Sequence, residues 1–239
     1  MVMGPRFAIF TEDSGKDAVA TIEALLRRLL PRIEPLAQPQ NVPPMTAPHG
    51  EVAQALRGHR WKDRKADVPR RALVRDLARR LSMGDFVVFH CDGDAAWGGT
   101  CPHDEPIDAL MADVARLLNR PVPAHFLRLV PHYSIESWLY LNRAAAERLV
   151  EQGKALPEAL EWLDANACAA RGYDHVTQPK RHCPLHDRYN RLLAEDDWPR
   201  DEAATRSPSW AQLEADWSAN PTLRAALRAT NPWATASSS

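Results

Sequence analysis

The most constraining feature of the sequence is a run of β-branched and aromatic residues flanked by glycines, Asp85-Phe86-Val87-Val88-Phe89-His90-Cys91-Asp92 between Gly84 and Gly93. Residues of these types favour β-strands, and glycines commonly bound such runs. An apolar run of this length is typical of a strand that helices cover on both faces of a parallel sheet. The run therefore predicts the central parallel strand of an α/β domain.

The segments around this strand alternate between strand and helix patterns. Residues 7–10 and 125–130 form further strand patterns, and amphipathic helices are predicted at residues 16–30, from Pro69 onward, and at residues 107–118. Residues 31–48 carry six prolines, so they predict a connection with at most a short edge strand, and Pro31 is expected to end the first helix. This alternation predicts a Rossmann-like α/β domain over residues 1–142, with a mostly parallel, doubly wound sheet.

The pattern changes after residue 142. Residues 143–233 contain Ala-rich helical segments, which predict a helical appendage, and residues 234–239 are predicted to form a disordered tail. No apolar run is long enough to span a membrane, and the N-terminus lacks the apolar core of a signal peptide. Four cysteines do not indicate a disulfide framework, so a cytoplasmic protein is expected.

Charge is unevenly distributed, although the 30 Lys and Arg residues nearly balance the 31 Asp and Glu residues. Residues 57–80 carry a local excess of +7, while acids dominate residues 81–120. A cationic stretch with an interleaved aromatic ring suits phosphate contact and base stacking, and a solvated helix face is the alternative. The candidate nucleic-acid contacts are Arg60, Trp61, Lys62, Arg64, Lys65, Arg70 and Arg71.

Acidic residues follow the predicted strands where each strand ends: Glu12 after the first, Asp92 and Asp94 after the central one, and Glu136 with His132 after the last. The carboxyl ends of parallel strands share one edge of a sheet, so these side chains are expected to converge. Carboxylates at i and i+2 in a Gly-containing turn can both face one hard cation, which predicts one or two Mg²⁺ or Mn²⁺ ions. The alternatives are a position beside a helix cap for Glu12, an ordinary turn for Asp92 and Asp94, and a helix-start pair for His132 and Glu136.

These residues resemble a known family. A Glu after the first strand, Lys16 at the opening of a helix, and a hydrophobic strand followed by Asp-x-Asp look like the TOPRIM domain of topoisomerases, primases and OLD-type nucleases, over residues 6–142. The resemblance implies that Glu12, Asp92 and Asp94 bind divalent metal. Residues 130–139 are also similar to a motif of TOPRIM-like proteins from bacterial defence operons, which implies Glu136 as a further acidic site residue. The sequence departs from the family in having Glu12-Asp13 where a Glu-Gly pair is usual.

A second cluster of candidate ligands lies further along the chain. Zinc is one interpretation of Cys168, His182, Cys183 and His186, although only the last two have the usual spacing. The other interpretation is that Lys180 and its neighbours reach back to substrate phosphate at the strand ends.

The hypothesis that follows is a metal-dependent nuclease that hydrolyses DNA or RNA. Glu12, Lys16, Asp92 and Asp94 are its expected catalytic residues, Glu12, Asp92, Asp94 and Glu136 its metal ligands, and His132 and Lys180 additional candidates. The resemblance implies a role in anti-phage defence beside an ATPase subunit supplied in trans, because the chain has no Walker A loop of its own. The alternative is a non-catalytic binding or regulatory subunit.

Overall fold

The computed structural model describes residues 5–13, 17–35, 45–46, 52, 55, 64–95, 98–195 and 197–229, without the side chains of residues 45–46 and 64–67. Its sheet has the strand order β2-β1-β3-β4, and every neighbouring pair is parallel. The strands are β1 (Phe7–Thr11), β2 (Met45–Thr46), β3 (Phe86–His90) and β4 (Phe126–Leu129). The predicted parallel α/β sheet is confirmed, with the edge strand β2 inside the proline-rich connection.

The strand order places a topological switch point between β1 and β3. The chain leaves β1 toward β2 on one side and then returns to β3 and β4 on the other side. In open parallel sheets, ligands bind at the carboxyl ends of the strands next to such a point. The residues that follow β1 and β3 are therefore the first place to look for a site.

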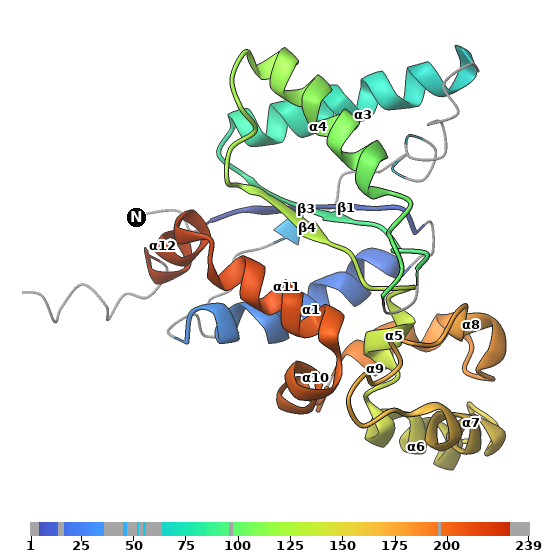
Figure 1. Ribbon diagram of the computed structural model, residues 1–239. Helices are drawn as coiled ribbons and strands as arrows, with labels where there is room; N and C mark the ends of the chain where they lie inside the picture. The colour runs from blue at the N-terminus through green and yellow to red at the C-terminus, as the bar shows by residue number, and fades with distance from the viewer. Residues whose placement is uncertain are drawn as a thin grey trace, which may run out of the picture.

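Helices cover both faces of the sheet, as Figure 1 shows. The side chains of Phe7 and Ile9 pack with α1 (Ala18–Ile33) in one apolar cluster, while Ala8 and Phe10 belong to a second cluster on the opposite face. That second cluster includes residues of α3 (Arg64–Ser82) and α4 (Asp104–Leu118). The alternation arises because successive side chains of a strand point to opposite faces, and each large apolar side chain buried in this way contributes roughly 1.5–3 kcal/mol.

Two prolines lie inside helices that they were expected to bound. Helix α1 continues through Pro31 to Ile33, and α3 begins at Arg64, before Pro69. The predictions that Pro31 ends the first helix and that Pro69 opens the second are wrong. Proline has a helical φ and removes only its own N–H donor; after Pro31 the Glu34 N–H still bonds the Leu30 carbonyl oxygen at 3.0 Å, and Ile33 is buried.

The rest of the described chain is helical and packs on the α1 side of the sheet (Figure 1). The elements are α5 (Glu136–Leu139), α6 (Arg143–Glu151), α7 (Glu158–Asn166), α8 (Pro179–His182), the 3₁₀ helix η2 (Asp187–Tyr189), α9 (Asn190–Ala194), α10 (Arg200–Arg206), α11 (Pro208–Ser218) and α12 (Pro221–Ala229). Apolar residues of these helices belong to the same buried cluster as those of α1 and the adjoining sheet face. The predicted tail at residues 234–239 lies outside the described residues.

Two tryptophans illustrate how this helical part is attached. The Trp217 indole N–H donates to the carbonyl oxygen of Arg128 in β4 at 2.9 Å, and the Trp138 indole N–H donates to Ser209 Oγ at 2.7 Å. Within the described residues, no helix is both long enough and apolar enough to cross a membrane.

Candidate metal centre

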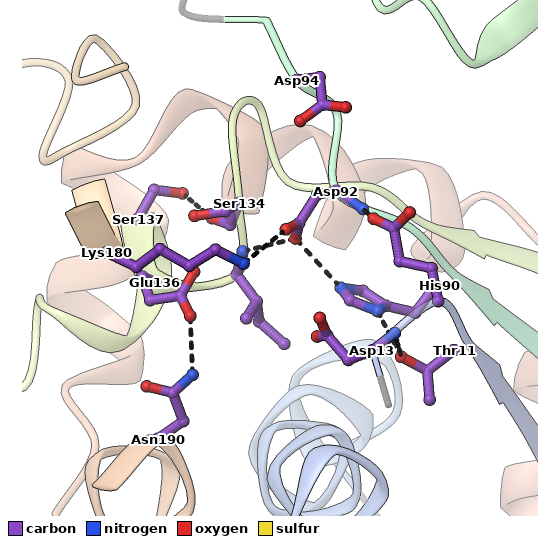
Figure 2. A network of polar contacts seen from close by, with 12 residues as sticks. Thr11, Asp13, His90, Asp92, Asp94, Ser134, Glu136, Ser137, Lys180 and Asn190 are labelled. Atoms are coloured by element: carbon purple, nitrogen blue, oxygen red, sulfur yellow. Dashed lines mark hydrogen bonds and ion pairs between the residues drawn. The ribbon is translucent and has the colours of Figure 1, made fainter. Parts of the chain in front are cut away.

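Three strand ends meet at one edge of the sheet. Thr11, the last residue of β1, is in register with His90, the last residue of β3, and Asp13 and Asp92 each follow two residues later. The loop after β4 leads directly to Glu136 at the start of α5. Figure 2 shows the side chains of these segments facing a common region.

Asp92 lies at the centre of this region and is only 8% exposed. Its Oδ1 accepts a hydrogen bond from the Ile135 backbone N–H at 3.1 Å, and its Oδ2 lies 3.7 Å from Lys180 Nζ. Burial raises the pKa of Asp92 well above its usual value, and the negative charges of Asp13, Glu136 and Glu12 raise it further, against the opposing effect of Lys180. A carboxylate under this repulsion gains from a nearby cation.

His90 is fully buried at the end of β3. Its Nδ1 lies 2.9 Å from Thr11 Oγ1, which also accepts the Asp13 backbone N–H at 3.1 Å. Its Nε2 lies 3.8 Å from Asp92 Oδ1 and has no hydrogen-bond partner among the described residues. Burial lowers the pKa of His90 to about 4, so the ring is neutral near pH 7 and can offer a lone pair to a metal.

Asp13, His90 and Asp92 form what we call the strand-end triad. One ligand atom from each lies within 4.8 Å of the others, and over the described ranges no other group of three or more His, Cys, Asp or Glu residues meets this criterion. The two carboxylates suit Mg²⁺ or Mn²⁺, and the imidazole favours a transition metal such as Mn²⁺ or Zn²⁺. The unpartnered Nε2 of His90 fits such an ion, because a buried ring nitrogen otherwise has a hydrogen-bond partner.

Glu12, expected as a metal ligand, lies beside the triad instead of within it. Its carboxylate accepts a hydrogen bond from the Asp92 backbone N–H and so braces the start of the turn after β3. Burial raises the pKa of Glu12; the hydrogen bond from Asp92 and the charge of His103 oppose the shift, and the charges of Asp13 and Asp94 add to it. Glu12 therefore adds negative charge to the region and holds the backbone of a triad residue.

Asp94, the second acid of the Asp-Gly-Asp turn, lies apart from Asp92 (Figure 2). It has a left-handed φ of 50°, its side chain is half exposed, and its Oδ2 lies 2.9 Å from His103 Nε2. The structure does not bring Asp92 and Asp94 together in one ligand group. The i, i+2 spacing of Asp92 and Asp94 is compatible with a shared ion, but the turn directs the Asp94 carboxylate toward the start of α4.

Gly93 shows what fixes this turn. A Cβ at this position would lie 2.3 Å from the carbonyl oxygens of both Pro131 and His132, so only glycine fits. The Asp94 and Ala95 N–H groups donate to the carbonyl oxygens of Tyr133 and His132 at 3.0 and 3.1 Å. His132, an additional candidate, thus contributes its backbone to the turn, and it lines a separate hollow of about 350 Å³.

Glu136 and Lys180 lie on the other side of Asp92. Glu136 is 3% exposed; its Oε1 accepts from Asn190 Nδ2 at 2.8 Å, and its Oε2 has no hydrogen-bond partner in the described part of the chain. Partial burial acts to lower the pKa of Lys180, but the charges of Glu136, Asp92, Asp13 and Glu12 outweigh it and raise that pKa. An adjoining hollow of about 430 Å³ is lined in part by Asp13, Glu136, Lys180, Arg188 and Asn190.

Most of the predicted nucleic-acid contacts, and the predicted catalytic lysine, fall outside the part of the chain that the structure describes. Lys16, Arg60, Trp61 and Lys62 lie outside the described residues, as do the side chains of Arg64 and Lys65. Arg70 is 6% exposed and bonds Asp113 through Nε at 2.8 Å, so it links α3 to α4. Arg71 is exposed and lines a groove of about 750 Å³ between these helices.

The zinc interpretation gains no support from the described residues. Cys168, His182, Cys183 and His186 are not among the groups close enough to share an ion, and all four cysteines of the chain are unpaired thiols. Lys180, from the same segment, does approach the strand ends.

Two triad residues were not among the predicted ligands. Asp13 was considered as the residue that follows Glu12 where the family has glycine, and His90 only as part of an apolar strand. A titratable residue at the last position of a central parallel strand was the available signal for His90, because that position faces the ligand-binding edge. Comparisons with known protein families, curated proteins and solved structures found no match.

Proposed function

We propose that this protein is a metal-dependent nuclease whose metal centre is the strand-end triad. The observation that carries the proposal is the Nε2 of His90, fully buried and without a hydrogen-bond partner among the described residues, beside the carboxylates of Asp13 and Asp92. In this assignment Asp13, His90 and Asp92 hold one Mg²⁺ or Mn²⁺ ion. When bound, such an ion polarises a phosphodiester and makes water a better nucleophile near neutral pH.

Two cations near the triad support an anionic substrate, provided that a bound metal ion offsets the four acids that line the same hollow. Lys180 and Arg188 line the hollow next to Asp13, and cations near a metal attract phosphate and position it. Glu12 holds the backbone of Asp92, and the hydroxyl of Thr11 holds the ring of His90. The TOPRIM resemblance supports the same reaction with a different ligand set, and the roles in anti-phage defence and beside an ATPase subunit rest on that resemblance alone.

The competing function is a non-catalytic binding or regulatory subunit. It is favoured by two contacts that these acids make without a metal: Lys180 with Asp92 at 3.7 Å and His103 with Asp94 at 2.9 Å. In this alternative the acids stabilise the sheet edge or bind a regulatory cation, and no phosphodiester is cleaved.

Cleavage assays separate the two functions. Purified protein is incubated with supercoiled plasmid, single-stranded DNA and tRNA in Mg²⁺ or Mn²⁺, with Asp92→Asn as the test variant. Asparagine keeps an acceptor for the Ile135 N–H but removes the charge. The nuclease predicts cleavage by the wild type and at least about 100-fold slower cleavage by the variant. Equal cleavage by both proteins, or none by the wild type with either ion, favours the non-catalytic subunit.

A further inference from the structure

Lys180 reaches the strand-end triad from a distant part of the chain. It lies on α8, which begins at Pro179, and its ammonium is 3.7 Å from Asp92 Oδ2. Figure 2 shows the side chain extending above Glu136 toward Asp92, on the side of Asp92 away from His90. The ammonium thus lies on the opposite side of a shared carboxylate from the proposed metal ion.

Glu136 supplies the second half of this arrangement. One of its carboxylate oxygens accepts from Asn190, and the other is buried with no hydrogen-bond partner in the described structure. A buried oxygen without a donor is costly unless a cation lies nearby. One carboxylate can bridge two metal ions. A second divalent ion beside the triad would therefore have Asp92 and Glu136 as its ligands.

We propose that the ammonium of Lys180 takes the place of a second divalent cation, so that the site holds a single metal ion. The ion binds Asp13, His90 and Asp92, and Lys180 occupies the region between Asp92 and Glu136. This inference rests on the metal centre of the proposed function, but not on cleavage. Charge is consistent with it: one divalent ion and one ammonium offset most of the negative charge of Glu12, Asp13, Asp92 and Glu136, the four acids that act on Lys180.

The test counts bound Mn²⁺ by titration calorimetry and electron paramagnetic resonance. The wild type is expected to bind one Mn²⁺ per chain at this site. Lys180→Met, which keeps most of the length of the side chain and removes its charge, is expected to bind two. Adding Glu136→Gln to Lys180→Met is expected to return the count to one. Lys154→Met is the matched control, because Lys154 is exposed in the turn between α6 and α7, and it is expected to bind one.

The outcomes separate this inference from the metal centre itself. Two Mn²⁺ ions on the wild type, or one on a folded Lys180→Met variant, overturn the role of Lys180 and leave the triad intact. No Mn²⁺ on the wild type overturns the triad as well. Thermal melting and circular dichroism establish that each variant is folded, and Lys180→Gln replaces Lys180→Met if the latter does not fold. A wild-type count of two or of none is decisive without any variant.

Discussion

Asp174 and Asp92 are both buried carboxylates, but their surroundings differ in kind. Asp174 is fully buried, and its oxygens accept hydrogen bonds from Ser207 Oγ, from Ser209 Oγ and from the Ser209 backbone N–H at 2.8–2.9 Å. Asp92 has one backbone donor, a lysine at 3.7 Å and other carboxylates around it. A buried charge that neutral donors surround stabilises the fold, whereas one surrounded by like charges favours a cation.

The sharpest test of the structural half of this comparison is Asp174→Ala. The substitution leaves Ser207, Ser209 and the Ser209 N–H without their acceptor in the core that joins α11 to α5, so we expect a loss of about 4 kcal/mol in the free energy of unfolding. Urea unfolding followed by tryptophan fluorescence measures it. Asp164→Ala is the matched control, because Asp164 is exposed and pairs with Arg143 in a surface contact. A loss no greater than that of the control would contradict a structural role for Asp174.

The second prediction concerns the buried His90. Its folded-state pKa of about 4 lies below the unfolded value of 6.5, so the unfolded chain binds the proton more readily. The stability that the neutral ring contributes is present above pH 6.5 and is lost as the pH falls toward 4, by about 3 kcal/mol in total. Asp92 and Glu12, whose pKa values are raised, change stability in the opposite direction, but they do so with and without His90.

Comparison with His90→Gln isolates this contribution. The unfolding free energy of the wild type, measured in urea from pH 7.5 to pH 4, should fall more steeply than that of the variant over this interval. Parallel pH profiles for the two proteins would show that His90 is not buried in its neutral form. Asp174→Asn serves as a control. It is expected to lower the stability but to leave the His90-dependent slope of unfolding free energy against pH unchanged.

The third prediction tests whether Asp92 favours a bound cation. Asp92→Asn removes a charge whose raised pKa shows that its ionised form is disfavoured in the fold, so the metal-free variant should melt no lower than the wild type. The same change should weaken Mn²⁺ binding by at least about 100-fold. Differential scanning fluorimetry with and without Mn²⁺ measures both effects. A variant that loses stability as Asp174→Ala does, yet keeps its Mn²⁺ shift, would place Asp92 with the structural carboxylates.

The sheet was predictable because strand signals depend on local patterns. The run around Val87 and Val88 identifies the central strand, and the parallel order places Thr11 beside His90. The composition of the triad depends on how the chain turns after each strand. Asp13 faces His90 while its neighbour Glu12 bonds the backbone of Asp92, and no periodicity distinguishes these two acids.

The positions of Asp94 and Lys180 also depend on contacts that a local sequence pattern does not contain. The turn at Gly93 is set by the Pro131 and His132 carbonyl oxygens, which a sequence pattern at residues 92–94 does not contain. The approach of Lys180 to the strand ends depends on how α8 packs beside α5. The sequence therefore supported this approach only as one of two interpretations of the segment. The edge of the sheet at which the strand-end triad lies was therefore predictable, and the members of the triad were not.

The smallest expected effect belongs to Asp94→Asn, which separates the triad from the ligand set predicted by the Asp-x-Asp pattern. Asp94 contacts His103, and its side chain is half exposed, so replacing its charge should change Mn²⁺ affinity by less than about 3-fold, the scale of a screened charge nearby. Asp13→Asn should instead weaken binding at least about 100-fold, because Asp13 contributes a ligand atom to the triad. Calorimetric titration of both variants with Mn²⁺ gives the two affinities under the same conditions. The reverse ranking, with Asp94→Asn the weaker binder, would mean that the turn after β3 rearranges to bring Asp94 to the metal and that Asp13 lies outside the centre.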